Sequence, residues 1–285
     1  MESINYIKAL RPEQWYKNIL VFLALIYSSN LFDPNKFLMA LLGFAVLSIL
    51  SSANYALNDM FDKSSDSKNP LKRHRPIASG KISLREASMM IFVLLATGFL
   101  LSSIVNLQFF LLMALFVAVS GAYTFFLKKQ ILSDILVIAV NFVIRAVSGA
   151  LIIDVYVSPW LVLCPFFLSL FISIGKRKAE LSILGKDAAK HRATLSYYKE
   201  EVANSLMMIT TAILVIAYTF YTLTVDAKLL ITLPVVIYGI FRYYHFISQK
   251  PMIAANPELA LTDKKFTLAL IMWLILTFVV LYVNP

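Results

Sequence analysis

Cysteine and charge are both scarce in this sequence. The single cysteine, Cys164, excludes an intramolecular disulfide and a zinc centre of several thiolates, and we expect it to pack in its apolar run. Charged residues make up only 15% of 285 residues, 60% are hydrophobic, and the mean hydropathy is +0.77. A soluble domain of this size has too little interior to bury that surplus. The composition therefore predicts a membrane-embedded protein.

Motifs of covalent catalysis are absent as well. The sequence contains no GxSxG, no P-loop and no Cys–His nucleophile arrangement. Met1–Leu10 lacks the apolar core and cleavage site of a signal peptide. There is no low-complexity segment and no convincing internal repeat, so we expect residues 1–285 to form a single domain.

Long apolar runs dominate what is present. A membrane span needs about 20 apolar residues, and nine runs approach that length, which predicts an all-α polytopic membrane protein of about nine helices. The runs are Trp15–Phe32, Phe37–Leu57, Ala87–Val105, Leu107–Leu127, Leu132–Ile153, Ser158–Ile174, Val202–Leu223, Leu229–Ile247 and Phe266–Tyr282.

Basic residues lie mostly on one side of these runs. With the N-terminus in the cytoplasm, 23 of the 26 Lys and Arg residues fall on that side, and only Lys36 and Lys228 lie outside. The positive-inside rule therefore predicts a cytoplasmic N-terminus and an outer C-terminus at Pro285. Two inner connections, 58–86 and 175–201, are long, so we expect the site to face the cytoplasm.

Acidic residues follow the second run, where topology requires none. The segment reads NDMFDKSSD, and Asn58, Asp62 and Asp66 share one face with Asp59 if the helix continues. Carboxylates gathered at a helix C-terminus repel one another and the dipole, so we expect these catalytic acids and Asn58 to hold Mg²⁺ with a substrate phosphate. The alternative is a solvated polar loop. Tyr55, on the same face, is either a ligand contact or an interfacial aromatic.

Two basic clusters could hold phosphate oxygens. The first contains Lys72 and Arg75 in KRHRP, and the second contains Lys176 and Arg177 in GKRK, with Arg192 following in KHR. Anchoring at the membrane surface is the alternative for both. The two loop histidines, His74 and His191, have no metal-ligand spacing.

Isolated residues near the ends of other runs point toward the same chemistry. Lys17 lies just inside the first run, after Trp15, and Lys128 lies at the end of the fourth, five residues after Tyr123. Arg145 lies thirteen residues into the fifth run, where a charge is costly and must face a partner or a wet cavity.

Together these segments resemble the UbiA superfamily of membrane-embedded prenyltransferases. NDMFDKSSD matches the NDxxDxxxD motif of that superfamily, most members of which carry a second aspartate-rich motif in the connection between helices 6 and 7. Here that position is basic. This departure resembles the branch that transfers phosphoribose to a polyprenyl phosphate. Segments matching that branch are RPEQWYKN at 11–18, NPLKRHRPIASG at 69–80, FVIRAVSGA at 142–150, GKRKAEL at 175–181 and HRATLSYY at 191–198.

The resemblance implies a helical bundle around a cytoplasm-facing cavity in the inner membrane. It implies Mg²⁺ as cofactor, with phosphoribosyl diphosphate (PRPP) and a polyprenyl phosphate as substrates of a cell-envelope pentose donor pathway. It implies no nucleic-acid partner and leaves a homo-oligomer open. An oxygen of the anionic lipid phosphate would attack C1 with inversion and without a general base, while the metal neutralises the leaving diphosphate. Lys17, Lys72, Lys128 and Arg145 would complete the phosphate shell, and Lys176, Arg177 and Arg192 would bind a further phosphate.

Three other functions stay open. The nearest is a prenyltransferase that joins a prenyl diphosphate to an aromatic or lipid acceptor, although the basic second cluster counts against it. A transporter would need inverted repeats and helices broken at the midplane. A structural subunit would have no use for the acidic motif.

Overall fold

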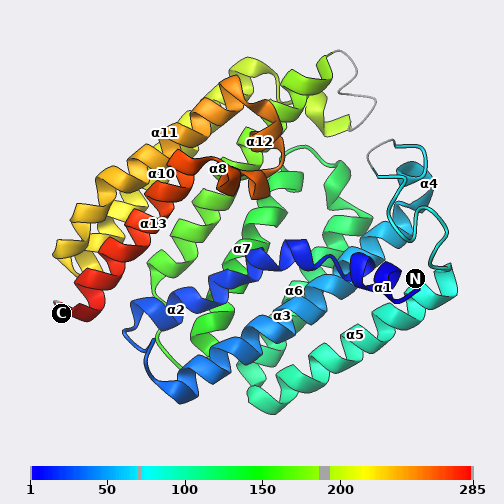
Figure 1. Cartoon of the computed structure of the whole chain (residues 1–285), viewed down its shortest axis with the longest axis horizontal. Helices are drawn as coiled ribbons and strands as arrows, with labels where there is room; N and C mark the ends of the chain where they lie inside the picture. Colours follow the sequence, from blue (N-terminus) through cyan, green and yellow to red (C-terminus); the bar gives the residue numbers. More distant parts are fainter. Residues whose placement is uncertain (1, 70–71, 186–192, 284–285) are drawn as a thin grey trace. The chain divides into compact units, whose positions relative to one another are not determined.

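The computed structural model describes residues 2–69, 72–185 and 193–283 (Figure 1). These residues form helices without strands, and eight helices are long and apolar enough to cross a membrane. The predicted all-helical membrane fold is therefore confirmed. The chain divides into two compact units, Met1–Lys128 with Ile144–Val157, and Lys129–Val143 with Ser158–Pro285. We describe each unit by itself.

Unit 1 is built around its longest helix, α3, which packs against α5 and α6 and against the N-terminal helices. Figure 1 shows α3 and α5 running side by side. Local caps fix the helix starts: Asp33 accepts from two backbone N–H groups of α3, and Ser83 forms a capping box with Glu86 at α5. The elements are α1 (Glu2–Leu10), η1 (Pro12–Val21), α2 (Phe22–Tyr27), α3 (Pro34–Phe61), α4 (Lys63–Asp66), α5 (Leu84–Val105), α6 (Leu107–Phe125), η2 (Leu127–Lys129) and the end of α7 (Ser133–Ile152).

The first predicted span, Trp15–Phe32, does not form one long helix. Its residues form η1, a 3₁₀ helix, followed by the six-residue α2, and neither is among the eight candidate spans. Ten residues is unusually long for a 3₁₀ helix. Buried polar contacts hold it in place: the amide of Asn18 donates to Ser48 of α3 at 3.1 Å and accepts from Arg145 of α7 at 2.9 Å.

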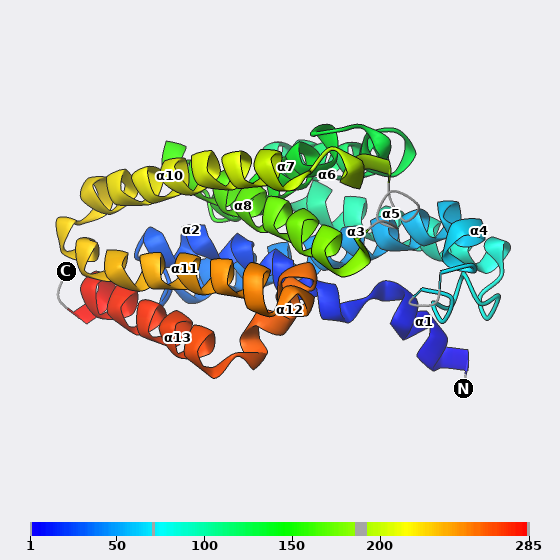
Figure 2. The same cartoon turned by 90° about the horizontal axis from the view of Figure 1, so that it is seen from above.

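Unit 2 is organised around α8, which packs against α10, α11 and α12, while α11 also packs against α13. Figure 2 shows α11 and α13 side by side. The described elements are the beginning of α7, α8 (Pro159–Leu184), η4 (Ala193–Ser196), α10 (Glu200–Val225), η5 (Ala227–Thr232), α11 (Leu233–Gln249), α12 (Pro251–Ala255), η6 (Pro257–Thr262), α13 (Lys264–Phe278) and the π-helical η7 (Val279–Val283).

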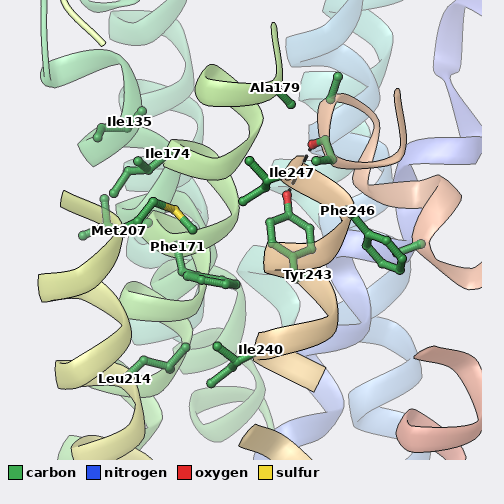
Figure 3. Packing of buried hydrophobic residues seen from close by; sticks show 14 of the residues in the cluster. Ile135, Phe171, Ile174, Ala179, Met207, Leu214, Ile240, Tyr243, Phe246 and Ile247 are labelled. Carbon is green, nitrogen blue, oxygen red and sulfur yellow. Dashed lines mark hydrogen bonds between the residues drawn. The ribbon is translucent and has the colours of Figure 1, made fainter. Parts of the chain in front are cut away.

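The core of unit 2 joins α8, α10 and α11 (Figure 3). The rings of Phe171 and Tyr243 lie 5.2 Å apart, and Ile247 packs beside them. Gly175 permits this close approach, because a Cβ there would lie 2.8 Å from both Ile247 and Tyr243. The core thus continues along α8 to the point where its basic segment begins.

Two predicted boundaries are wrong in a way that matters for the site. Residues 58–61 belong to α3, and residues 175–184 form the last turns of α8, although both were expected to begin inner connections. The GKRKAEL segment is therefore helical. Its Ala179 belongs to the buried core of unit 2, and its Arg177 is buried as well.

Gly149 offers a direct test of how η1 docks on α7. A Cβ at this position would lie 1.9 Å from the backbone oxygen of Val21, whereas a Cβ at Gly239, also inside a helix, would meet nothing within 4 Å. We expect Gly149→Ala to lower the thermal unfolding midpoint by several degrees, because backbone must move. Gly239→Ala should leave the midpoint unchanged or raise it, since alanine favours helix by about 0.5–1 kcal/mol. Equal midpoints for the two variants would contradict this packing.

Asp263 ties α11 to α13 within unit 2. Its carboxylate accepts hydrogen bonds from Arg242 at 3.1 and 2.7 Å and from Lys250 at 3.1 Å, and it caps α13 at the Phe266 N–H. The bonds from Arg242 hold the pKa of Asp263 well below its usual value. A depressed folded-state pKa stabilises the fold fully above the unfolded pKa of about 3.9, and this contribution is lost as pH falls toward the folded value.

Replacement of Asp263 by asparagine should therefore destabilise the protein in a pH-dependent way. We expect the unfolding midpoint of Asp263→Asn to lie a few degrees below wild type at neutral pH, and the gap to narrow below about pH 4. Thermal unfolding in detergent across pH measures this. Asp154→Asn, at an exposed position, is the control; a gap for Asp263→Asn that does not change with pH would refute the argument.

Candidate active site

The acidic motif lies where α3 ends. Asp62 caps α3 with backbone angles of −87° and 5°, and α4 begins at the next residue. The backbone N–H groups of Asp62 and Asp66 still bond the carbonyl oxygens four residues earlier, at 2.9 and 2.7 Å. Within this segment the acids fall into two groups, each with its own cations.

The first group consists of Asn58, Asp62 and Lys128. The ammonium of Lys128, on η2, donates to Asp62 Oδ1 at 2.6 Å and to Asn58 Oδ1 at 3.3 Å. An amide oxygen and a carboxylate oxygen from neighbouring turns of α3 thus converge on one point beside a cation. Asp62 and Lys128 remain partly accessible. This arrangement confirms that the Asn–Asp pair shares one face, as its spacing predicts.

The second group holds the other two acids. Asp59 and Asp66 are almost fully buried, at 2% and 3% exposure, and both accept hydrogen bonds from Arg75, at 3.0 and 2.6 Å. Lys72 lies 3.6 Å from Asp66. The group joins the end of α3 to the basic cluster that follows α4. Buried carboxylates need such partners, since an isolated ion in a low-dielectric interior is very costly.

Arg11 completes this second group, and it was not among the predicted site residues. It forms an ion pair with Asp59, and its guanidinium lies 5.4 Å from the ring centre of Tyr55. Its backbone is left-handed, with φ of 53°, which is uncommon for a residue other than glycine. The sequence contained one signal for it, the RPEQWYKN segment that Arg11 begins.

Three other predicted residues in unit 1 lie in different surroundings. Lys17 donates to Gln14 at 2.6 Å on η1. Arg145 is 6% exposed, bonds Asn18, and lies 4.8 Å from the Phe116 ring centre. Its cost in the membrane interior is thus offset by a polar partner and an aromatic face. Tyr123 is half-buried on α6.

Unit 2 contains a separate buried network around Asp134, which lies on α7. Its carboxylate accepts from Arg177 at 3.2 Å, Tyr198 at 2.7 Å and Thr194 at 3.3 Å. Asp134 and Arg177 are 0% and 3% exposed, and Arg177 also bonds Glu180 at 2.8 Å. Burial and the bond to Asp134 raise the pKa of Tyr198, so its hydroxyl stays protonated and donates.

This network accounts for one cation of the predicted second phosphate cluster. The charge of Arg177 is met by the buried carboxylate of Asp134 and the partly exposed carboxylate of Glu180, whereas Lys176, the preceding residue, is half-buried on α8. Arg192, the third predicted cation, lies outside the described residues. Residues 193–198 are fixed to α7 and α8 through Asp134.

The oxygen donors in unit 1 fit a hard divalent cation. Among residues 2–69, 72–185 and 193–283, no three His, Cys, Asp or Glu side chains gather closely enough to hold a metal ion by themselves. Mg²⁺ is commonly bound by only one or two carboxylates, with water and substrate phosphates completing its octahedron. Asn58 and Asp62 supply such a partial set. Asp59 and Asp66 are already occupied by arginine.

Comparisons with known proteins agree with this architecture. Residues 18–262 match the model of the UbiA prenyltransferase family. The chain is 31% identical to a decaprenyl-phosphate phosphoribosyltransferase of Mycolicibacterium smegmatis, over 94% of this chain and 89% of that protein. A protein of the same name from Corynebacterium glutamicum is 28% identical, over 98% and 87%.

A solved structure extends the likeness to three dimensions. The UbiA homolog from Archaeoglobus fulgidus bound to GPP and Mg²⁺ aligns with a TM-score of 0.73 at 19% identity, covering 97% of this chain and 99% of that one. The family match spans most of the sequence, and the helical fold is shared. The chain therefore belongs to the UbiA prenyltransferase family.

Proposed function

We propose that this protein transfers 5-phosphoribose from PRPP to a polyprenyl phosphate and releases diphosphate. Two relatives named decaprenyl-phosphate phosphoribosyltransferase align along nearly the whole chain. The convergence of Asn58, Asp62 and Lys128 carries the proposal, because it brings metal-type oxygen donors and a cation to one point. A diphosphate leaving group needs both.

Asn58 and Asp62 are the residues to which we assign Mg²⁺. A solved relative from Archaeoglobus fulgidus is bound to GPP and Mg²⁺, which supports a divalent metal in this family. When bound, the ion would neutralise the negative charge of the leaving diphosphate. We assign a different role to Asp59 and Asp66, whose paired carboxylates fix Arg75 and Arg11, so that these cations are already oriented when substrate arrives.

The remaining residues of unit 1 act by binding and orienting anions. Lys128 can donate to a diphosphate oxygen in place of Asp62, and Lys72 and Arg75 can donate to further phosphate oxygens. The attacking oxygen belongs to a phosphate that is ionised at neutral pH, so the chain need not remove a proton. Attack opposite the leaving group inverts C1. Tyr55, Tyr123 and Lys17 are further candidates for contact with the substrates.

The basic α8 segment separates this activity from its nearest rival. A prenyltransferase with two metal clusters would require acids there, whereas the α8 segment presents Lys176 after Gly175. Together PRPP and a polyprenyl phosphate carry three phosphate-bearing groups, so additional cations favour them. From the distribution of Lys and Arg we further propose a cytoplasmic site and a product that donates pentose to the cell envelope.

Asp62 is the sharpest test of the metal assignment. Asp62→Asn keeps the size of the side chain but removes a charged ligand, so we expect transfer of labelled PRPP into the lipid fraction to fall at least about a hundredfold. The Mg²⁺ concentration for half-maximal activity should rise. Asp154→Asn, at an exposed residue, is the matched control. Full activity in Asp62→Asn would exclude the metal assignment, and transfer only from a prenyl diphosphate would favour the rival.

Neighbouring cations on α8 should respond differently to substitution. Arg177→Ala leaves Asp134 buried without its guanidinium, a loss that typically costs about 3–5 kcal/mol, so the unfolding midpoint should fall sharply. Lys176→Glu should lower the midpoint less than Arg177→Ala does, and should raise the apparent KM for PRPP or lipid several-fold. The unfolding midpoint and the KM of each variant test this. If Arg177→Ala and Lys176→Glu change both quantities in the same way, the two residues do not have separate roles.

A further inference from the structure

A shallow pocket lies on unit 1 beside the acidic motif. Its volume is about 370 Å³, and it belongs to the end of α3, to α4, and to the start of α5. The motif residues that line it are those between the acids, so this pocket uses the part of NDMFDKSSD that the proposed reaction leaves unassigned. Its lining residues are Met60, Phe61, Lys63, Ser64, Ser67, Ala78 and Leu84.

One part of the pocket is polar and cationic. The nearest carboxylates already have other partners, because Asp62 pairs with Lys128 and Asp66 pairs with Arg75. Ser67 donates its hydroxyl proton to the Ser64 carbonyl at 3.1 Å. The donors that remain at the pocket are therefore the Lys63 ammonium and the Ser64 hydroxyl, a pair suited to the oxygens of one phosphate.

The surface near this polar part is also basic. Two exposed cations flank Leu84 in the chain: Lys81 precedes it and Arg85 follows it. The nearby carboxylate of Glu86 is engaged by the Ser83 N–H at 2.7 Å and by Tyr6 at 3.1 Å. The local balance therefore favours an anion.

The other part of the pocket is apolar and continues onto an exposed aromatic surface. Phe61 is 54% exposed and packs on Phe125 at a ring-centre distance of 4.5 Å, and Phe126 follows at 6.0 Å from Phe125, with 68% exposure. Leu84 and Met60 form the adjoining wall. A ligand held by Lys63 could therefore lay an apolar chain over these rings.

The place of the pocket along the helices matches the surface of a bilayer. The 28 residues of α3 span about 42 Å at 1.5 Å per residue, more than the hydrocarbon thickness of about 30 Å. Its last turn, with Phe61, therefore reaches the headgroup region. Basic pockets at this level between spans bind anionic headgroups in other membrane proteins.

We propose that this pocket binds the phosphate of a membrane lipid, with Lys63 and Ser64 holding the phosphate and Phe61, Phe125 and Leu84 contacting the chain. The ligand class is an anionic phosphate ester with an apolar tail, supplied either by the bilayer or by the lipid substrate. The site does not depend on the proposed activity.

Native mass spectrometry of the detergent-purified full chain, titrated with dioleoylphosphatidylglycerol, measures this binding. We expect Lys63→Glu to raise the apparent Kd about tenfold. Lys68→Glu, an exposed lysine of the same connection that does not line the pocket, should change it less than about twofold. Lys63→Ala, a milder change, should fall between wild type and Lys63→Glu. Equal losses in Lys63→Glu and Lys68→Glu would overturn the proposal in favour of general surface charge.

Other probes separate the two parts of the pocket and the two sources of ligand. Dioleoylphosphatidylcholine should bind much more weakly than dioleoylphosphatidylglycerol, and inorganic phosphate should not compete with either lipid. Tight binding of dioleoylphosphatidylcholine, or competition by inorganic phosphate, overturns the proposal. Leu84→Gln should weaken binding more than Leu100→Gln, an exposed leucine elsewhere on α5. A preference for undecaprenyl phosphate assigns the pocket to the lipid substrate, and a preference for phosphatidylglycerol assigns it to the bilayer, with the site upheld in either case.

Discussion

The pairing of buried charge constrains this protein more than any other interaction. In a chain that is 60% hydrophobic, a carboxylate inside the fold is tolerable only with a cation against it. Asp59, Asp66 and Asp134 each meet an arginine at the junction of several helices. These pairs fix where the polar segments attach to the apolar helices.

In unit 1 this constraint divides one motif between two roles. Asp59 and Asp66 pair with Arg75, whereas Asp62 lies with Asn58 beside Lys128. The buried ion pairs of Asp59 and Asp66 with Arg75 thus support the partly accessible oxygen pair of Asn58 and Asp62.

Much of this could be predicted from the sequence, and the missing parts share a physical cause. The length of an apolar run predicts the long helices, because the hydrocarbon thickness sets how many consecutive apolar residues a span needs. The pairings of Asp59 with Arg11 and of Asp62 with Lys128 join residues 48 and 66 positions apart, and no local pattern encodes such distances. Arg177 shows the same limit: its sequence neighbours suggest a phosphate ligand, while Asp134, 43 positions away, makes it part of the core. Likewise, η1 departs from the expected span because α3 and α7 hold it through Asn18.

Lys176 and Arg177 are neighbours in the sequence but lie in different surroundings on α8. The sequence alone suggests one function for the whole basic cluster. In a helix, however, adjacent residues are about 100° apart, so the two side chains cannot share one environment. Arginine, with its planar fork of donors, suits the buried bond to Asp134 and Glu180, whereas lysine, a point charge on a flexible stem, suits a less buried position. The GKRK segment therefore has two roles on one turn of α8. Arg177 holds α8 to α7 and to residues 193–198 through Asp134, and Lys176 is a cation on the helix that this bond keeps in place.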